Sequence, residues 1–237
     1  MIFDPLYFII LAPAMLLSFV ASMWVRSAYA EGSRIPASSG VSGAEAAHMI
    51  LQAHDIHNVG IEQSHGGQLS DHYDPRHKVL RLSPDVYHGR SVAALGIAAH
   101  EAGHAVQDAV RYAPLAIRNG AVPMASIGSN FSWILLIIGI VMGGAQSTVG
   151  SWLVWAGIGL FGCVVFFQLI NLPVEFDASR RAKDLLQKAN LVAPGPEANA
   201  MVKVLNTAAW TYVAATLTAI LTLVYFLIRS GVLGRRE

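Results

Sequence analysis

The sequence contains a single cysteine and few charged residues. Of its 237 residues only 13% are charged, well below the share in an ordinary soluble domain, whereas 54% are hydrophobic. The lone Cys163 excludes an intrachain disulfide and gives no information about the redox compartment. The net charge is +1 and no cluster of basic residues is present, so we expect no nucleic-acid partner. This composition indicates a membrane protein.

Four long apolar runs without charged residues account for the composition. Each holds about 20 residues, the length that a helix needs to cross the hydrocarbon core of a bilayer. The runs cover residues 6–25, 124–144, 152–172 and 208–228. A soluble domain of this size does not need four buried core helices. The sequence therefore predicts a mainly α membrane protein with four transmembrane helices.

The first run lacks the basic segment that precedes the apolar core of a secretory signal peptide. It follows Met-Ile-Phe-Asp-Pro and is too long for such a core. The triplet 28–30, Ala-Tyr-Ala, fits a cleavage site, but Arg26 lies between it and the run. We therefore predict a retained membrane anchor.

The apolar runs divide the chain into five regions. These are a first transmembrane helix (1–26), a polar region (27–123), two transmembrane helices (124–172), a second polar region of loop and helix that carries the candidate third ligand (173–207), and a fourth transmembrane helix with its tail (208–237). With four crossings, both polar regions must lie on the same side of the membrane. The loops 26–123 and 173–207 hold 13 of the 16 lysines and arginines, and the positive-inside rule places them in the cytoplasm. The tail residues Arg229, Arg235 and Arg236 argue the other way.

The most informative motif is His-Glu-Ala-Gly-His at 100–104. Positions i and i+4 of a helix share a face, so His100 and His104 can direct their imidazoles at one metal ion. The stretch around them is apolar and rich in helix formers. Glu101 is placed to take a proton from a water on the metal and pass it to the leaving amine. This pattern predicts a catalytic site with one Zn²⁺ ion per chain, although such a short motif also arises by chance.

A catalytic zinc site needs a third protein ligand on the same side of the membrane. Glu175 follows the third apolar run and is flanked by apolar residues, where an acid is costly unless it is paired. Its alternative role is a surface acid paired with an arginine. Asp177 competes with it, but Asp177 and Arg181 are also spaced to form an ion pair on a helix. From the residues alone the choice remains open.

The first polar region predicts a small α+β unit around the motif. Residues 42–57 have a helical apolar pattern, with Ser42 and Glu45 spaced as a capping box. Strands are expected at 59–63, 69–73 and 79–82, with a turn at 74–77 between the last two. We expect a small antiparallel sheet just before the metal helix. Its edge could bind an extended peptide by main-chain hydrogen bonds.

Five segments, in this order, resemble the bacterial membrane neutral zinc metallopeptidases, the YugP-like proteins. They are LSDHYDP at 69–75, LRLS at 80–83, VY at 86–87, AAHEAGHAVQ at 98–107 and LPVEFDASR at 172–180. The resemblance spans nearly the whole chain. It implies a multi-pass membrane zinc peptidase with a zincin-like region, His100 and His104 as ligands and Glu101 as the catalytic acid.

The family is similar in layout to the CAAX-prenyl and HtpX-type peptidases, which carry a downstream E-x-x-x-D. The resemblance implies that Glu175 is the third ligand, as in gluzincin peptidases. The position of the usual aspartate holds Ser179, so the hydrogen bonding around the ligands departs from the pattern. His72, Tyr73, Asp177 and Arg180 are candidates for hydrogen bonds to the metal ligands or for contacts with the substrate or the oxyanion.

Three functions remain from the sequence. The first is a zinc endopeptidase that cleaves membrane or membrane-proximal proteins at the cytoplasmic surface of the cell membrane. The second is a site-2-type intramembrane protease, although its motif would lie in a transmembrane helix, and residues 91–110 are too polar for one. The third is a zinc-binding scaffold or chaperone partner without turnover, which the intact Glu101 disfavours. The expected partners are a peptide or protein substrate and the lipid bilayer, with a homo-oligomer or regulatory membrane protein as further candidates.

Overall fold

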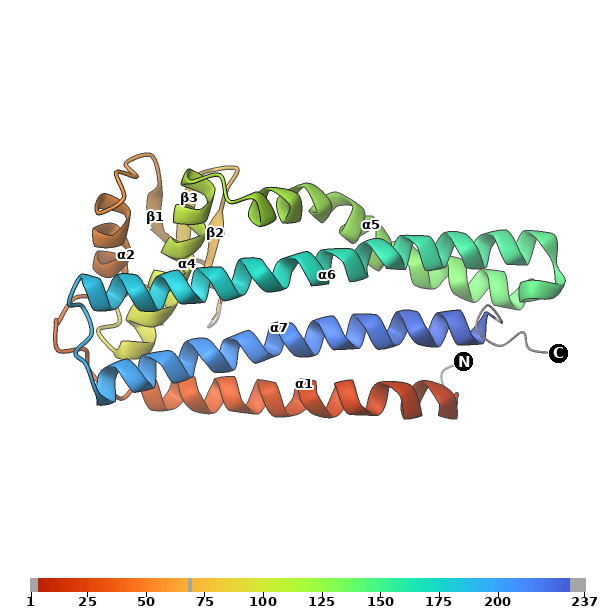
Figure 1. The fold of residues 1–237 in the computed structure, drawn as a ribbon, viewed down its shortest axis with the longest axis horizontal. Coiled ribbons are helices and arrows are strands. Elements are labelled where there is room, and N and C mark those ends of the chain that lie inside the picture. The colour runs from red at the N-terminus through yellow and green to blue at the C-terminus, as the bar shows by residue number, and fades with distance from the viewer. Residues whose placement is uncertain (1–3, 68–69, 231–237) are drawn as a thin grey trace. The chain divides into compact units, whose positions relative to one another are not determined.

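The computed structural model describes residues 4–67 and 70–230 and is mainly helical. In chain order the elements are α1 (Pro5–Gly32), α2 (Gly43–Gln52), β1 (Gly60–Gln63), β2 (His72–Asp74), β3 (Val79–Leu82), α3 (Pro84–Tyr87), α4 (Val92–Ala109), α5 (Ala113–Val141), the short 3₁₀ helix η1 (Gly144–Gln146), α6 (Thr148–Lys188) and α7 (Pro196–Arg229) (Figure 1). Among the described residues, α1, α5, α6 and α7 are long and apolar enough to cross a membrane. The prediction of a mainly α protein with four membrane helices is confirmed.

The chain divides into two compact units. Unit 1 comprises Met1–Val20, Ile117–Leu172 and Tyr212–Glu237, and unit 2 comprises Ala21–Ala116 and Pro173–Thr211. All four long helices contribute residues to both units. The polar segment after residue 172 is therefore more helical than its composition suggests, because α6 continues to Lys188 and α7 begins at Pro196.

Unit 1 is built from large apolar side chains of the long helices. Its buried cluster includes Leu136 and Phe161, and an aromatic group surrounds Phe226. The ring of Phe226 makes edge contacts with Trp133 at 4.7 Å and Phe161 at 5.3 Å between centroids. Such contacts stabilise beyond area burial alone.

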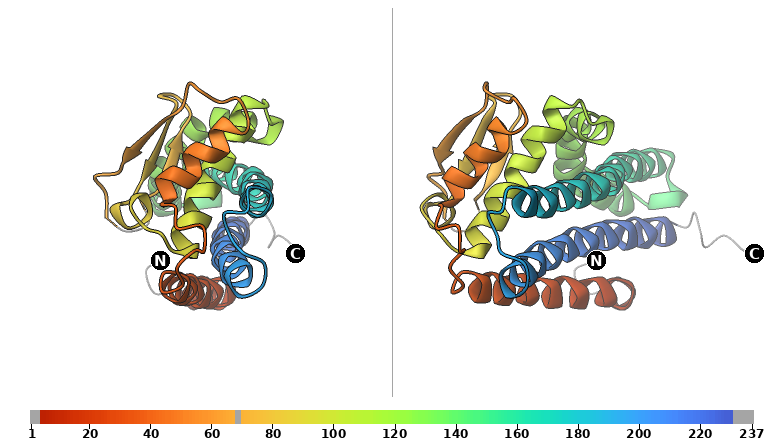
Figure 2. Two further views of the ribbon diagram at one scale, coloured as in Figure 1. Left: turned by 90° about the vertical axis from the view of Figure 1, so that its left-hand side faces the viewer. Right: turned by 60° about the vertical axis from the view of Figure 1, so that its left-hand side comes forward.

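Unit 2 contains the sheet and the short helices. Figure 2 shows the three strands beside α2 and α4. Strand β3 lies in the middle of the order β1-β3-β2. It pairs antiparallel with β2, as expected, but parallel with β1. The prediction of a purely antiparallel sheet was therefore wrong in its first strand. The central strand β3 is the most buried of the three, and its apolar sequence Val-Leu-Arg-Leu suits that place, whereas β1 is largely exposed.

Local signals predicted the turn and the start of α2 correctly, but not its end. The capping box is present, with Ser42 Oγ accepting from the Glu45 amide and the Glu45 carboxylate accepting from the Ser42 amide. Asp74 Oδ1 accepts from two amides of the β2–β3 turn. The helix ends at Gln52 rather than near residue 57, because Asp55 adopts a left-handed φ of 55°, which a helix interior does not accept. Leu69, placed in the second predicted strand, lies outside the described residues.

Candidate metal centre

Two histidines project from one face of α4. The helix is capped by Ser91, whose hydroxyl accepts a hydrogen bond from the Ala94 amide. Alanine and glycine fill most of the turns that follow. His100 and His104 lie one turn apart, and their ring centroids are 4.9 Å apart. Local sequence therefore accounts for this pair.

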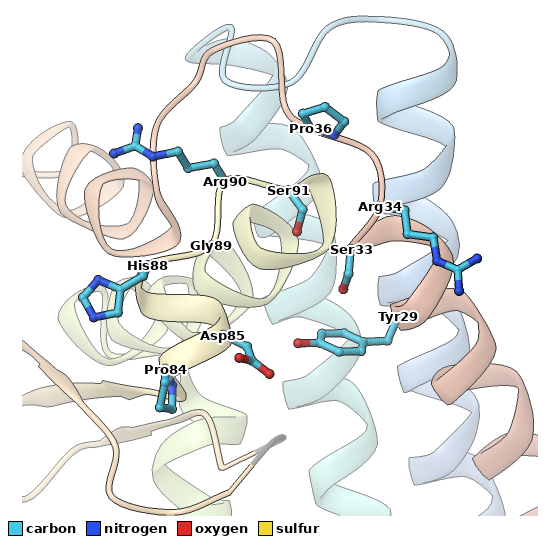
Figure 3. A pocket seen from close by; sticks show the side chains of 10 residues that line it. All are labelled: Tyr29, Ser33, Arg34, Pro36, Pro84, Asp85, His88, Gly89, Arg90 and Ser91. Carbon is cyan, nitrogen blue, oxygen red and sulfur yellow. The ribbon is translucent and has the colours of Figure 1, made fainter.

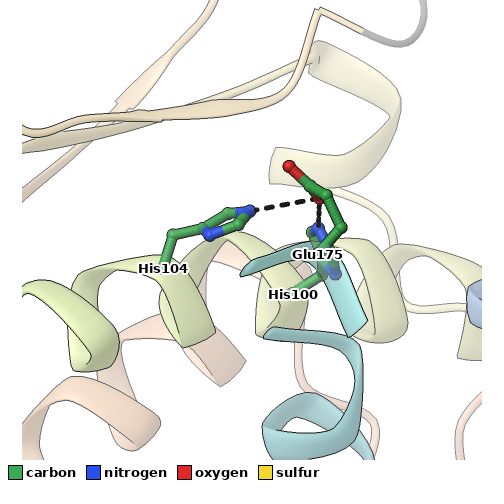
Figure 4. A group of neighbouring side chains, drawn as sticks. All are labelled: His100, His104 and Glu175. Atoms are coloured by element: carbon green, nitrogen blue, oxygen red, sulfur yellow. Dashed lines mark hydrogen bonds and ion pairs between the residues drawn. The ribbon is translucent and has the colours of Figure 1, made fainter. Parts of the chain in front are cut away.

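The third donor comes from α6, 75 positions after His100. Glu175 Oε2 lies 3.2 Å from Nε2 of His100 and 3.5 Å from Nε2 of His104 (Figure 4). One donor atom from each of the three residues lies within 4.8 Å of the others. The Glu175 side chain is only 4% exposed, so its charge requires partners. The structure thus brings together the three residues expected to be ligands.

The distances from Glu175 to the two histidines suit a tetrahedral zinc ion, and the two histidine nitrogens lie within 4.8 Å of each other. With bonds of about 2.0–2.1 Å to nitrogen or oxygen, tetrahedral geometry separates two donors by roughly 3.3 Å. The two separations from Glu175, 3.2 and 3.5 Å, lie on either side of that value. Imidazole and carboxylate are also the donor types of catalytic zinc sites. The residues present therefore fit the ion that the motif predicts.

The surroundings of His104 favour positive charge despite its burial. Burial by itself lowers the pKa of His104, but the hydrogen bond and negative charge of Glu175 outweigh it, and Glu101 adds to them. The pKa of His104 therefore lies above its ordinary value. A bound metal ion would be another source of positive charge next to the buried carboxylate of Glu175.

Small residues allow α4 and α6 to approach each other at the site. A Cβ atom added to Gly103 would lie 2.9 Å from the carbonyl oxygen of Ala178 and 3.4 Å from its Cα. Ala102, Ala178 and Ala182 are fully buried. Any side chain at position 103 would push α6 away and move Glu175 from the two histidines.

Glu101 is held by the sheet. Its Oε2 atom accepts a 3.1 Å hydrogen bond from the backbone amide of Tyr73 in β2. The Tyr73 amide therefore points toward α4 and does not take part in the hydrogen bonds between β2 and β3. Strand β2 is the edge strand on this side of the described sheet. The carboxylate that follows His100 is thus oriented by the strand beside the metal helix.

The side chains of His72 and Tyr73 bond to groups other than the candidate ligands and Glu101. The Tyr73 hydroxyl donates to Asp108 Oδ2 at 2.6 Å, and Lys78 Nζ reaches the same oxygen. Burial and Asp108 raise the pKa of the Tyr73 phenol well above its usual range. His72 is exposed, and its Nδ1 lies 2.8 Å from the Ser70 carbonyl. Tyr73 thus approaches the site through its backbone amide.

Asp177 and Arg180 lie on α6 beside the site. Asp177 forms ion pairs with Arg180 and Arg181, so the expected pairing of Asp177 with Arg181 is confirmed. The Arg180 side chain is 62% exposed. Asp177 also accepts a hydrogen bond at 3.0 Å from Gln107. Asp177 therefore reaches the histidines only through another side chain.

Two residues that the sequence reading did not single out as functional contact the histidines directly. Gln107 Oε1 lies 3.0 Å from Nδ1 of His104, and Ser179 Oγ lies 3.1 Å from Nδ1 of His100. The helical spacing of Gln107, three positions after His104, is a signal that could have found it. Ser179 was noted only for replacing an aspartate.

A separate hollow of about 630 Å³ lies near the start of α4 (Figure 3). Its lining residues come from the end of α1, from the loop that follows it, and from the segment between β3 and α4: Tyr29, Ser33, Arg34, Pro36, Pro84, Asp85, His88, Gly89, Arg90 and Ser91. Ser91 precedes His100 by nine positions, about 13 Å along a helix. The hollow therefore contains none of the candidate ligands.

Comparison with known proteins agrees with the geometry. The model of the family described as "Putative neutral zinc metallopeptidase" matches residues 7–231. The chain belongs to this family. It is 40% identical over 221 residues to a Bacillus subtilis (strain 168) protein described as "Putative membrane protease YugP", covering 93% of this chain and 95% of that protein. No solved structure gives a significant match. The family resemblance of the motifs is confirmed, whereas the likeness to HtpX-type peptidases remains a prediction.

Proposed function

We propose that this chain is a membrane zinc endopeptidase in which His100, His104 and Glu175 hold the ion and Glu101 transfers protons. The observation that carries the proposal is the convergence of three zinc-type donors beside Glu101. Family membership supports the reaction class. A zinc ion held by these residues would supply Lewis-acid activation of water and of the peptide carbonyl.

Glu101 performs the proton transfers in this proposal. As the oxygen of water adds to the carbonyl carbon, Glu101 takes its proton. The same carboxyl group then gives the proton to the amine nitrogen as the carbon–nitrogen bond breaks. The Tyr73 amide bonds Oε2 of Glu101 at 3.1 Å and so limits rotation of the carboxylate. This preorganisation reduces the reorganisation needed during the reaction.

Strand β2 is the proposed binding edge for an extended substrate. It pairs with β3 on one side, and its other side is directed toward Glu101. Because the Tyr73 amide is bonded to Glu101, a peptide that adds to this edge would bond other main-chain groups of β2 and would pass in front of Glu101. Such binding suits segments that are unfolded near the membrane, which supports membrane or membrane-proximal proteins as substrates.

The decisive experiment is Glu101→Gln, with zinc content and peptide turnover measured on the same sample. Turnover should fall by about 10² to 10⁴-fold, the usual contribution of general acid–base catalysis. Zinc should remain stoichiometric, because Glu101 is not a ligand. Glu62→Gln is the matched control, since Glu62 is an exposed acid on β1. Full activity of Glu101→Gln would refute the mechanism and favour a binding scaffold.

The site-2-type alternative requires the motif to lie within a membrane-spanning helix. Among the described helices, α4 is not one of those long and apolar enough to span. This observation favours a surface peptidase. Cysteine accessibility at position 100 tests it, because labelling by a water-soluble reagent is expected for a surface site.

We propose that both polar regions face the cytoplasm, from the distribution of lysine and arginine. Reporter fusions at Ser39 and Asn190 should give cytoplasmic signals, and a fusion at Ala145 should give the opposite signal. An external signal at Ser39 or Asn190 would reverse the orientation and leave the chemistry of the site unchanged.

A further inference from the structure

The ring nitrogens of His100 and His104 that face away from Glu175 have defined partners. His104 Nδ1 lies 3.0 Å from Gln107 Oε1, and Gln107 is fully buried. A buried amide must satisfy its donors and its acceptor within the protein. The partners of Gln107 therefore determine how it faces His104.

The orientation of the Gln107 amide follows from two groups that can only accept hydrogen bonds. Its Nε2 atom lies 2.8 Å from the carbonyl oxygen of Val174 and 3.0 Å from Asp177 Oδ2. The NH₂ group must face these oxygens, so the amide oxygen faces His104. An amide oxygen accepts and never donates. His104 consequently carries a hydrogen on Nδ1, which leaves Nε2, the nitrogen that faces Glu175, as the atom that can bind a metal.

The carboxylate behind Gln107 is compensated by other charges. Asp177 pairs with Arg180 and Arg181, and its side chain is 11% exposed. Its negative charge is thus balanced by two guanidinium groups, while the group in contact with His104 is a neutral amide. The chain of contacts from Arg181 through Asp177 and Gln107 orients His104 without placing a full charge on it.

His100 also has a neutral partner. Its Nδ1 lies 3.1 Å from Oγ of Ser179, which is 5% exposed. If Nε2 serves as the ligand atom, Nδ1 carries the hydrogen and the hydroxyl oxygen accepts it. Ser179 follows Glu175 by one helical turn, so one face of α6 supplies both the carboxylate and the orienting hydroxyl.

We propose that Gln107 and Ser179 are positioning residues that hold the two histidines through neutral oxygens, and that Gln107 also selects the metal-binding tautomer of His104. This inference rests on the proposed zinc site and deepens it. A carboxylate hydrogen-bonded to a ligand histidine makes that imidazole more basic. Neutral partners leave more positive charge on the bound ion. The site should therefore bind zinc less tightly, but polarise its substrate more strongly, than the same site with an acid at position 179.

Zinc affinity measured by chelator competition tests the positioning roles. We expect Ser179→Ala and Gln107→Ala each to weaken zinc binding by about 10 to 100-fold, the usual effect of losing such a partner. Each should also change the visible absorption spectrum of the cobalt-substituted protein, because the imidazole can rotate. Ser179→Thr, which keeps the hydroxyl, should restore both properties. Ser132→Ala removes a buried serine of unit 1 and serves as the matched control.

Ser179→Asp tests the charge argument separately. We expect it to bind zinc up to about tenfold more tightly than the wild type. Binding that is equal or weaker would overturn the charge argument. Wild-type affinity and an unchanged cobalt spectrum in both alanine variants would overturn the positioning roles. If Glu175→Ala also retains wild-type zinc affinity, the failure lies in the proposed metal site itself rather than in the roles of Gln107 and Ser179.

Discussion

The two units treat their buried polar groups differently. In unit 1, Thr218 and Thr222 donate to carbonyl oxygens one turn earlier in the same helix, although the Thr216 hydroxyl also reaches the Gln168 carbonyl on α6. In unit 2, Gln107 donates to Val174 and Asp177 on another helix. Groups satisfied within one helix tolerate a shift of neighbouring helices. Groups satisfied between helices fix the distance of α4 from α6, which is what a metal site needs.

Side-chain size follows the same division. The core of unit 1 contains large residues such as Phe161, Tyr225 and Phe226. Around the site in unit 2, Ala102, Gly103 and Ala178 bring the backbones of two helices together. Bulky side chains stabilise through buried area, whereas small ones allow close backbone approach. Changes in unit 1 should therefore alter stability, and changes beside the site should alter metal binding.

The largest effect on metal binding is expected from Glu175→Ala. It removes one of three donors and leaves two buried histidines without their carboxylate. Zinc affinity should fall by more than the roughly 10 to 100-fold expected when a residue that hydrogen-bonds a ligand is lost, and turnover should disappear. Asp177→Ala should reduce zinc affinity and turnover without abolishing either. Asp184→Ala, an exposed acid on the same helix, is the control. Stoichiometric zinc in Glu175→Ala, with loss in His72→Ala or Asp177→Ala, would show that another residue is the ligand.

Phe226→Ala tests whether a change in unit 1 alters stability but not metal binding. Loss of this buried ring should cost about 3–5 kcal/mol of unfolding free energy, as for large aromatic residues in other cores. The zinc affinity of the folded fraction should not change. Thermal unfolding in detergent, together with zinc titration, measures both quantities. A large drop in zinc affinity without a drop in stability would contradict the division of roles.

The smallest expected effect comes from exchanging glycine for alanine in each unit. Gly103→Ala introduces a Cβ atom 2.9 Å from a backbone oxygen, and overpacking of this kind typically costs about 1–3 kcal/mol. It should also reduce zinc affinity, because α6 carries Glu175. Gly159→Ala in unit 1 meets no atom within 4 Å and should be neutral or stabilise by up to about 1 kcal/mol. Equal behaviour of the two variants would show that the close approach at Gly103 has no role in the site.

Patterns of short range predicted much of the fold. The apolar runs located the four long helices, and the Ser42–Glu45 pair marked the start of α2. Loop and helix were predicted over 173–207, but the sequence did not define where α6 ends, because its final turns are polar and are stabilised by packing against the rest of unit 2. The parallel pairing of β1 with β3 was missed for a related reason. Sequence spacing favours neighbouring hairpins, but burial decides which strand is central.

The sequence by itself determined that His100 and His104 share a helix face, since the pitch of a helix depends only on spacing. It also determined the membrane class, since bilayer thickness sets the length of an apolar run. Only the tertiary structure decided which acid faces the histidines and which oxygens contact their other nitrogens. Those contacts join residues 75 and 79 positions apart for His100. They depend on the close packing of α6 against α4 at Gly103, which no local pattern specifies.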